Sequence, residues 1–448
     1  MSKELFERLE KGRITRRDFL KGVGLAAGTV ALSSVVGFRG LGQQPPFPIK
    51  VGTLYAHTGP LAEFGPNFVN AAELAASHRN EAAQIELGIE KVIELVHEDS
   101  ETAPGPAVEA ARKLVEIEKV VAISGALASG VTIPVAVSVS IPTKTPQVSP
   151  ASTSPAITVL PEDEAPGADF LFRTCPSDAL QGVIAGKLAA ELGYKTASIL
   201  YVNNPYGFGL QDQFTKSFEH RGGKVLASVP HPEEAIPSYV AELRQCLEPE
   251  LPDILYCLSY PGHATVYMRE AIEIFDYIGR GGKFFFCDGT KSLLIPEAVG
   301  PENVEGMFGT APGAALSPSY DTFIAEYGKV YGAPPPLPFM TNTYDSIAVI
   351  AFAAVAAWIK GAEEITGEVI RDQLRPVAAP PGEAFGVGVD EFVKAFKVLK
   401  EGGEINYEGA AGSVDFDEHG DVVTPIEVWK YVGGVPTVVR LEYEIPEI

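Results

Sequence analysis

Cysteine is scarce in this chain of 448 residues, which has four: Cys175, Cys246, Cys257 and Cys287. None belongs to a C-x-x-C pair, so the sequence gives no support to a zinc site or a thioredoxin-type redox motif. The even number leaves disulfides open in an oxidising compartment. Two of the four lie in apolar, strand-like runs, which favours buried free thiols.

Positive charge is also in short supply. The chain has 35 Lys and Arg against 58 Asp and Glu, and its net charge is −23. Residues 1–40 carry +4, so the remainder carries −27. Such an acidic surface repels phosphate backbones and anionic lipid, so we expect neither nucleic acid nor a membrane surface as a partner.

Enzyme motifs are missing too. The sequence contains no G-x-S-x-G, no G-x-x-x-x-G-K-[ST], no G-x-G-x-x-G after a strand and no H-E-x-x-H. Its seven histidines are scattered. We interpret the cluster His97-Glu98-Asp99 as a solvated strand end and His263 as a helix-start residue at a cleft rim. The sequence therefore predicts no catalytic residue, no cofactor and no metal.

The N-terminal residues have the pattern of an export leader. A charged stretch, residues 15–21, precedes an apolar run over 23–38, and Arg16-Arg17 followed by Phe19-Leu20-Lys21 matches the twin-arginine export consensus. An amphipathic first helix is the alternative, but the run contains three glycines and has no polar face. We assign residues 1–45 to a leader and linker, with cleavage between 37 and 45, and expect an exported, periplasmic or extracytoplasmic protein.

No later segment is expected to span a membrane. The most apolar one, residues 346–359, is shorter than the roughly 20 residues that a span needs. Its length is typical of a buried helix.

Short apolar runs with strand-forming residues alternate with helical stretches from residue 49 onward. The predicted strands are residues 49–54, 91–97, 120–124, 146–149, 196–202, 224–229, 253–259 and 283–287. The predicted helices are residues 62–79, 106–117, 130–140, 180–192, 209–222, 239–247, 264–277, 320–331 and 343–360. Strands separated by helices of this length indicate βαβ units and parallel sheets.

Two domains are needed to accommodate these elements. Residues 49–160 already fill one doubly wound domain, and a second set of strands starts after Phe170. We expect the chain to cross between domains near 170–174 and near 307–312. Near the C-terminus, residues 412–416, 422–431 and 437–443 are strand-like, with a turn at 417–421.

Polar and aromatic side chains follow five predicted strands, at the carboxyl ends where open α/β sheets bind ligands. Ser129 and Thr153 are natural N-caps for the helices after them, and helix N-termini suit an anion such as a carboxylate. Tyr206, Tyr260 and Asp288 come from the second domain and suit a cation. Alone, each of the five has a structural explanation: helix capping, loop anchoring, core packing or turn formation. Together they predict a site for the two charges of an α-amino acid.

The order of these residues resembles that of the leucine/isoleucine/valine-type periplasmic binding proteins of ABC transporters. The resemblance extends along nearly all of residues 48–430. It rests on residues 49–52 and 58–65, the serine loop at 125–129, the Pro-Ala-Ser-Thr loop at 150–153, the Tyr-Gly pair at 206–207, Tyr260, Asp288 and the late turn at 416–421.

The resemblance implies an α/β fold with two doubly wound parallel-sheet lobes joined by a three-crossing hinge, the periplasmic binding protein type I fold. It places residues 46–172 and 312–408 in lobe 1, and residues 173–311 and 409–448 in lobe 2. It also implies a monomeric carrier that clamps a small ligand, most simply an amino acid, between the lobes and docks on a membrane permease.

The resemblance further implies a role for each polar site residue. Ser129 and Thr153 would hold the ligand carboxylate. The carbonyl of Ala151, together with Asp288 and Tyr206, would hold the ammonium group.

Tyr260 and Phe64 would flank the ligand side chain. The sequence departs from the family pattern at position 64, where Tyr is common, and at Asp288, where Glu is frequent; the cysteine pair that many relatives carry in lobe 1 is absent. Because side-chain pockets set specificity, an amide, urea or an aromatic acid is the alternative ligand. A second alternative is a ligand sensor that hands its ligand to a membrane receptor. The leader disfavours a cytoplasmic regulator.

Overall fold

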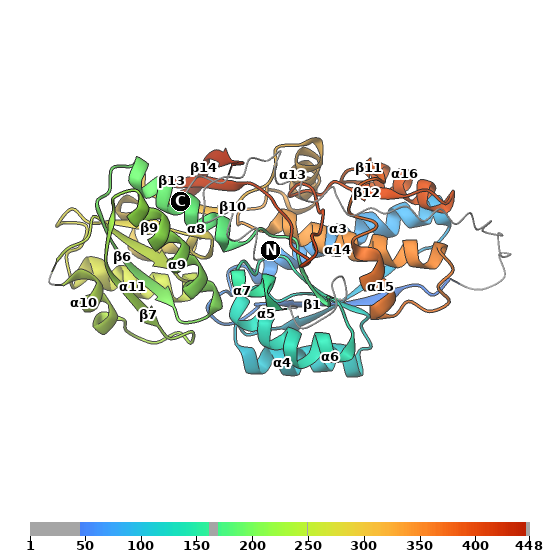
Figure 1. Cartoon of the computed structure of the whole chain (residues 1–448), viewed down its shortest axis with the longest axis horizontal. Coiled ribbons are helices and arrows are strands. Elements are labelled where there is room, and N and C mark those ends of the chain that lie inside the picture. The colour runs from blue at the N-terminus through green and yellow to red at the C-terminus, as the bar shows by residue number, and fades with distance from the viewer. Residues whose placement is uncertain (1–44, 161–168, 249, 445–448) are drawn as a thin grey trace.

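Two lobes, each built on its own sheet, make up the computed structural model, which describes residues 45–160, 169–248 and 250–444 (Figure 1). The α/β class with parallel sheets is confirmed. The predicted leader at 1–45 lies almost entirely outside the described residues, so the structure says nothing about it.

Lobe 1 is built on sheet A, whose five strands are all parallel in the order β2-β1-β3-β4-β5. The strands are β1 (Ile49–Tyr55), β2 (Ile93–Asp99), β3 (Ala122–Gly125), β4 (Gln147–Ser149) and β5 (Leu171–Arg173). Six of the seven residues of β1 are buried, because helices cover both faces of a parallel sheet. This burial explains why the strand has a nearly continuous apolar sequence.

Two long helices pack on one face of sheet A, α3 (Gly65–Leu87) and α14 (Met340–Ile359), and α16 (Val389–Lys400) packs on these two helices. The opposite face carries α4 (Pro104–Arg112) and α5 (Ser129–Val135) (Figure 1). The remaining described elements of lobe 1 are shorter or lie away from sheet A. They are η1 (Lys113–Ile117), η2 (Ala136–Ser140), α6 (Ile141–Thr143), α7 (Pro155–Thr158), α13 (Pro318–Tyr331), α15 (Gly367–Leu374), β11 (Glu383–Phe385) and β12 (Ile405–Tyr407).

Lobe 2 is built on sheet B, with seven strands in the order β14-β13-β10-β9-β8-β6-β7. They are β6 (Thr196–Val202), β7 (Lys224–His231), β8 (Ile254–Leu258), β9 (Lys283–Phe286), β10 (Phe308–Pro312), β13 (Ile426–Val432) and β14 (Val435–Glu442). The first five run parallel, whereas β13 and β14 are antiparallel to their neighbours.

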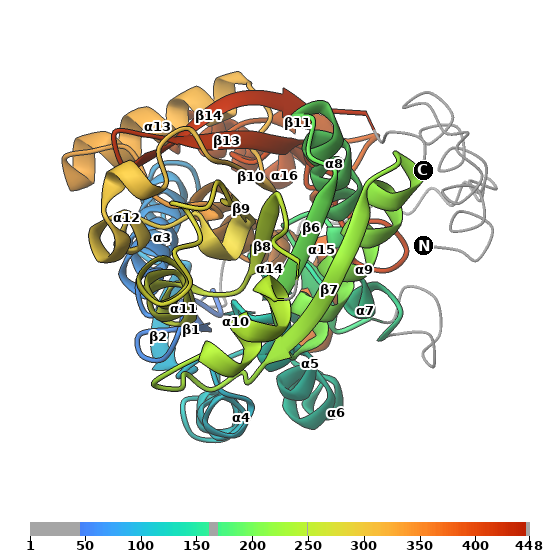
Figure 2. The ribbon, with the colours of Figure 1, turned by 90° about the vertical axis from the view of Figure 1, so that its left-hand side faces the viewer.

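Helices cover both faces of sheet B, as Figure 2 shows. They are α8 (Asp178–Glu191) and α9 (Pro205–His220) on one side, and α10 (Val240–Leu247) and α11 (Pro261–Glu273) on the other; the short elements are η4 (Asp288–Thr290), α12 (Leu294–Val299) and η5 (Pro301–Asn303). Alternate residues of β8 face opposite ways, so Tyr256 packs with the α9 residue Phe214, and Leu255 belongs to the cluster that contains Leu243 of α10.

The chain passes between the lobes three times, from β5 to α8, from β10 to α13 and from β12 to β13. The two segments predicted as crossings are themselves the strands from which the chain leaves, β5 and β10. The strand predicted at 412–416 is wrong, because only Ser413 forms an isolated bridge, to Glu408. Gly412 has a φ of +137°, which interrupts an extended ladder.

The most apolar helix, α14, is long and apolar enough to cross a membrane, and 89% of its apolar stretch is buried inside the protein. The prediction of a buried helix is therefore confirmed. All four cysteines are free and buried, which confirms the expectation of buried thiols.

Candidate functional site

A cavity lies between the lobes, with about 350 Å³ of empty space, part of it open to solvent. Most of its lining residues come from the loops at the ends of strands in both sheets, whereas Phe68 lies in α3 and Phe339 precedes α14. The lining residues are Leu61, Phe64, Phe68, Leu127, Ala128, Ser129, Ala151, Tyr206, Tyr260, Asp288, Gly289 and Phe339. The cavity therefore lies where parallel strands of two sheets end, the usual ligand position in open α/β folds.

Asp288 is the charged group of this cavity. It begins η4, directly after β9 and Cys287, and is 4% exposed. Its Oδ1 accepts hydrogen bonds from Gln181 Nε2 at 2.7 Å and from the Tyr206 hydroxyl at 2.9 Å. Burial raises the pKa of Asp288 to about 6, although these two hydrogen bonds oppose the shift. Within the described residues, the cavity lining therefore gives this carboxylate no positive partner.

A second buried acid, Asp178, lies close enough to Asp288 for their charges to interact. It opens α8, and its Oδ2 accepts a hydrogen bond from Thr153 Oγ1 at 2.8 Å, while its Oδ1 has no partner. Burial, and then the charge of Asp288, raise the pKa of Asp178 well above its ordinary value. Arg173 offsets this only in part, because its guanidinium forms a bidentate pair with Asp421 at 2.7 and 2.6 Å.

Two stacked phenols stand beside Asp288. The rings of Tyr206 and Tyr260 are 5.7 Å apart at an interplanar angle of 14°. The Tyr206 hydroxyl also accepts a hydrogen bond from the Gly289 N–H at 3.3 Å. The Tyr260 hydroxyl accepts one from Asn204 Nδ2 at 3.0 Å. Both phenols are therefore fixed by lobe 2 itself.

Ser129 provides a hydroxyl from lobe 1. Its Oγ accepts a hydrogen bond from the Ser154 N–H at 3.1 Å, so the hydroxyl hydrogen remains for an acceptor in the cavity. The prediction that Ser129 and Thr153 cap helices is wrong. The residue before α5 is Ala128, and α7 is capped by Ser154, whose Oγ accepts from the Ala156 N–H. The Thr153 hydroxyl instead donates to Asp178.

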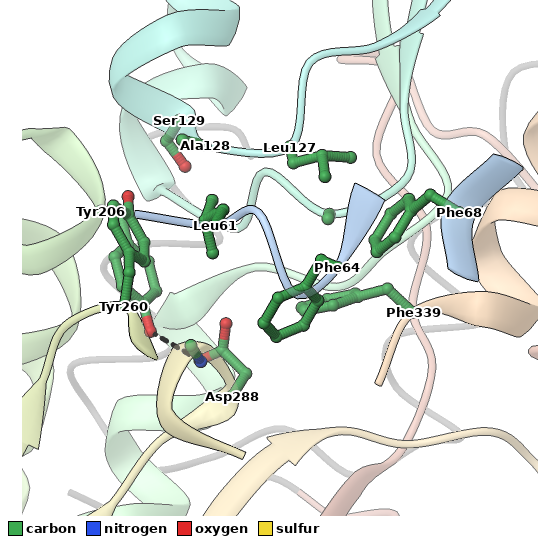
Figure 3. A pocket seen from close by; sticks show the side chains of 12 residues that line it. Leu61, Phe64, Phe68, Leu127, Ala128, Ser129, Tyr206, Tyr260, Asp288 and Phe339 are labelled. Atoms are coloured by element: carbon green, nitrogen blue, oxygen red, sulfur yellow. Dashed lines mark hydrogen bonds between the residues drawn. The ribbon is translucent and has the colours of Figure 1, made fainter. Parts of the chain in front are cut away.

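The other end of the cavity is apolar. Figure 3 shows Phe64, Phe68 and Phe339 grouped on the side away from Tyr206. Phe339 immediately precedes α14 and has a left-handed φ of +70°, which is uncommon for a bulky residue. A ligand with a polar head and a branched or aromatic side chain matches this division.

Six of the seven predicted site residues line the cavity: Phe64, Ser129, Ala151, Tyr206, Tyr260 and Asp288. The seventh, Thr153, is 1% exposed and reaches the site only through Asp178. Sequence reasoning missed Asp178, Phe68 and Phe339.

The two histidines that the sequence analysis interprets as structural, His97 and His263, do not line the cavity. His263 is fully buried rather than at a rim, because its Nδ1 pairs with the Tyr239 hydroxyl at 2.8 Å. His97 pairs with Thr53 at 2.6 Å and Glu73 at 2.9 Å. Within the described residues, no group of three or more His, Cys, Asp or Glu side chains could hold a metal ion.

The fold and this site define a two-lobed protein that binds a small solute between its lobes. A family model described as periplasmic binding protein matches residues 48–390. The chain belongs to this family and is a solute-binding protein of the ABC transporter type, and membership implies an extracytoplasmic location.

Relatives support this assignment. A chemotactic signal transduction system substrate-binding protein, BasB of Halobacterium salinarum, is 28% identical over 82% of this chain and 83% of its own length. A leucine-, isoleucine-, valine-, threonine- and alanine-binding protein of Pseudomonas aeruginosa is 25% identical over 84% of this chain and 87% of its own length.

Solved structures share the fold. The leucine-binding protein LivK of Thermotoga maritima has a TM-score of 0.70 at 24% identity, covering 88% of this chain and 98% of that one. An ABC transporter solute-binding protein of R. palustris in complex with benzoate has a TM-score of 0.66 at 18% identity, covering 90% and 98%.

Proposed function

We propose that the protein captures an amino acid in the cavity between its lobes and delivers it to an ABC transporter permease. It acts by binding and release, without catalysis. The ammonium group binds Asp288, with Tyr206 and the Ala151 carbonyl beside it. The carboxylate binds Ser129, and the side chain lies among Phe64, Phe339 and Tyr260.

The observation that carries this proposal is a buried carboxylate in a cavity without a cation. None of the lining residues is a lysine or an arginine. A buried charge is costly unless it is paired, and Asp178 adds a second acid nearby. A ligand ammonium supplies the missing charge, and a ligand without one leaves it missing.

A ligand screen tests the proposal. Residues 46–448 are purified and heated with twenty amino acids, with leucinamide, urea and benzoate as comparison compounds. Amino acids with branched or aromatic side chains should raise the melting temperature, because a ligand that binds only the folded state stabilises it. Stabilisation by benzoate or urea alone would contradict the amino-acid assignment.

An aromatic acid is the second candidate. Three phenylalanines form the apolar end of the cavity, and the raised pKa of Asp288 lets this residue become a neutral hydrogen-bond donor. The complex of a structural neighbour with benzoate supports the same idea. Calorimetry with benzoate and with phenylalanine separates the candidates, since only the second compound carries an ammonium group.

Delivery to a receptor is the alternative to delivery to a permease. The relative from Halobacterium salinarum is named for chemotactic signalling, so a sensing role is compatible with the same site. A strain that lacks the protein distinguishes the two roles. Loss of growth on the identified solute would indicate transport, and loss of movement toward the solute would indicate sensing.

We further propose the lobe boundaries 46–172 with 312–408, and 173–311 with 409–448, a monomeric state and a twin-arginine leader. Support for the boundaries comes from sheet membership, since β1–β4 belong to sheet A and β6–β9, β13 and β14 to sheet B, and the first two boundaries fall within one residue of the ends of β5 and β10. A fusion of residues 1–45 to a reporter tests the leader: Arg16→Lys/Arg17→Lys should abolish export, and continued export would point to a general secretory route.

A further inference from the structure

One segment of lobe 1, residues 60–63 between β1 and α3, forms hydrogen bonds with lobe 2. The Pro60 carbonyl accepts from the Gly262 N–H at 3.0 Å. Glu63 Oε1 accepts from the Leu293 N–H at 2.8 Å, and Glu63 Oε2 accepts from the Ser292 hydroxyl. We call residues 60–63 the closure segment.

The closure segment is connected to the cavity on both sides. Leu61 lies within it, Phe64 follows it, and both line the cavity (Figure 3). Its partners in lobe 2 flank the site as well, since Gly262 follows Tyr260 by two residues and Ser292 follows Asp288 by four. Glu63 itself is not among the lining residues.

The contact requires close approach of the two lobes. A Cβ atom at Gly262 would lie 2.8 Å from Pro60 Cα, closer than real Cβ contacts. At a second place, a Cβ at Gly130 of α5 would lie 3.1 Å from Asn204 Cβ of lobe 2, tighter than most real Cβ contacts. The lack of a side chain at Gly262 above all lets the lobes meet.

A solute can enter a cavity whose walls come from both lobes only if the lobes separate. Separation breaks the three hydrogen bonds of residues 60–63, because each joins one lobe to the other. Hydrogen bonds to a charged carboxylate are among the stronger ones in proteins. Glu63 therefore favours the closed arrangement over the open one.

We propose that Glu63 is a latch residue, which helps to hold the lobes closed and so prolongs the time for which a captured solute stays bound, without touching the solute. This inference rests on the proposed function, in that it assumes capture by closure. It does not depend on which solute is captured.

A pair of spin labels, one on each lobe, measures closure without any ligand. Glu116→Cys in lobe 1 and Glu219→Cys in lobe 2 place the labels at exposed positions. The four native thiols are buried and do not compete for the label. Double electron–electron resonance then gives the ratio of open to closed molecules.

Glu63→Ala in this background should raise the ratio of open to closed molecules by about tenfold, because the hydrogen bonds to the carboxylate are lost. Ser292→Ala should raise this ratio less, and Glu63→Ala/Ser292→Ala should raise it no more than Glu63→Ala alone. Glu81→Ala is the matched control, since Glu81 is an exposed acid of α3. Equal ratios for Glu63→Ala and Glu81→Ala would overturn the proposal.

A binding arm separates this inference from the proposed function. With L-leucine or benzoate as the probe, Glu63→Ala should speed dissociation by about tenfold and leave the melting temperature of the ligand-free protein near that of Glu81→Ala. If none of the twenty amino acids binds, the proposed function fails, while the ratio of open to closed molecules still decides the role of Glu63. If a probe binds and Glu63→Ala leaves its dissociation rate unchanged, the proposed role of Glu63 is contradicted.

Discussion

The two walls of the cavity differ in chemistry. Lobe 2 contributes a buried carboxylate and two stacked phenols, all fixed by hydrogen bonds within that lobe. Lobe 1 contributes one free hydroxyl, at Ser129, and an apolar surface. The difference teaches that the charged group of the cavity comes from lobe 2, whereas lobe 1 adds one hydroxyl to a mainly apolar wall. Loss of the carboxylate should therefore cost more affinity than loss of any single lobe 1 group.

The largest effect is expected for Asp288→Asn. The amide keeps an acceptor for Gln181 and Tyr206 but removes the charge. Amino-acid affinity should fall by about 100-fold, because a buried ammonium loses its charged partner. Isothermal calorimetry measures the change. Unchanged affinity would remove Asp288 from the ammonium site, and a gain in benzoate affinity would favour the aromatic-acid alternative.

The pH dependence of binding comes next. The Asp288 pKa is raised to about 6, so the carboxylate is ionised above this pH and protonated below it. Affinity for an amino acid should be full at pH 7 to 8 and should fall about tenfold per pH unit below 6. A benzoate-type ligand should show the opposite trend. Calorimetry between pH 4.5 and 8 measures the affinity for each ligand and so distinguishes the two trends. In Asp288→Asn, the affinity should not change through pH 6.

Removal of the lobe 1 hydroxyl should cost less. Ser129→Ala should weaken amino-acid binding by about tenfold, the value of one hydrogen bond to a carboxylate. Ser140→Ala is the matched control, because Ser140 is also a buried serine of lobe 1 but donates to Gln147 at 2.8 Å, away from the cavity. Equal affinities for the two variants would show that lobe 1 recognises shape alone.

The smallest effect on affinity is expected for Thr153→Val. The substitution leaves both side-chain oxygens of Asp178 without a hydrogen-bond donor among the described residues, since Oδ1 already lacks one. Unfolding free energy, measured with urea, should fall by about 1–3 kcal/mol. Affinity should change by less than about fivefold. A larger loss of affinity at unchanged stability would mean that Thr153 contacts the ligand directly.

The sheets could be predicted from the sequence because their signal is local. Alternation of short apolar runs with helical stretches placed β6 at Thr196–Val202, as the structure has it. The small pair of β11 and β12 was missed, because three-residue strands leave almost no periodicity. The false strand at 412–416 contains a glycine whose φ of +137° only the structure reveals.

The candidate site was predictable where a residue follows a strand end. Ser129, Tyr206, Tyr260 and Asp288 share this position, and topology alone brings them together. Asp178 could not be found this way, because an acid in the first turn of a helix ordinarily needs no ligand to explain it. Phe339 lies far along the chain from every other lining residue, so only long-range packing brings it to the cavity.

The burial of the four thiols affects the chemical stability of the protein outside the cytoplasm. Burial raises the pKa of Cys246 and of Cys287 to about 12, and raises the pKa of Cys175 and Cys257 as well. Such thiols are neither ionised nor reachable, so oxidants react with them slowly. A chain that folds in reducing conditions can therefore enter an oxidising compartment with its covalent structure unchanged. It needs no enzyme that forms disulfides in that compartment.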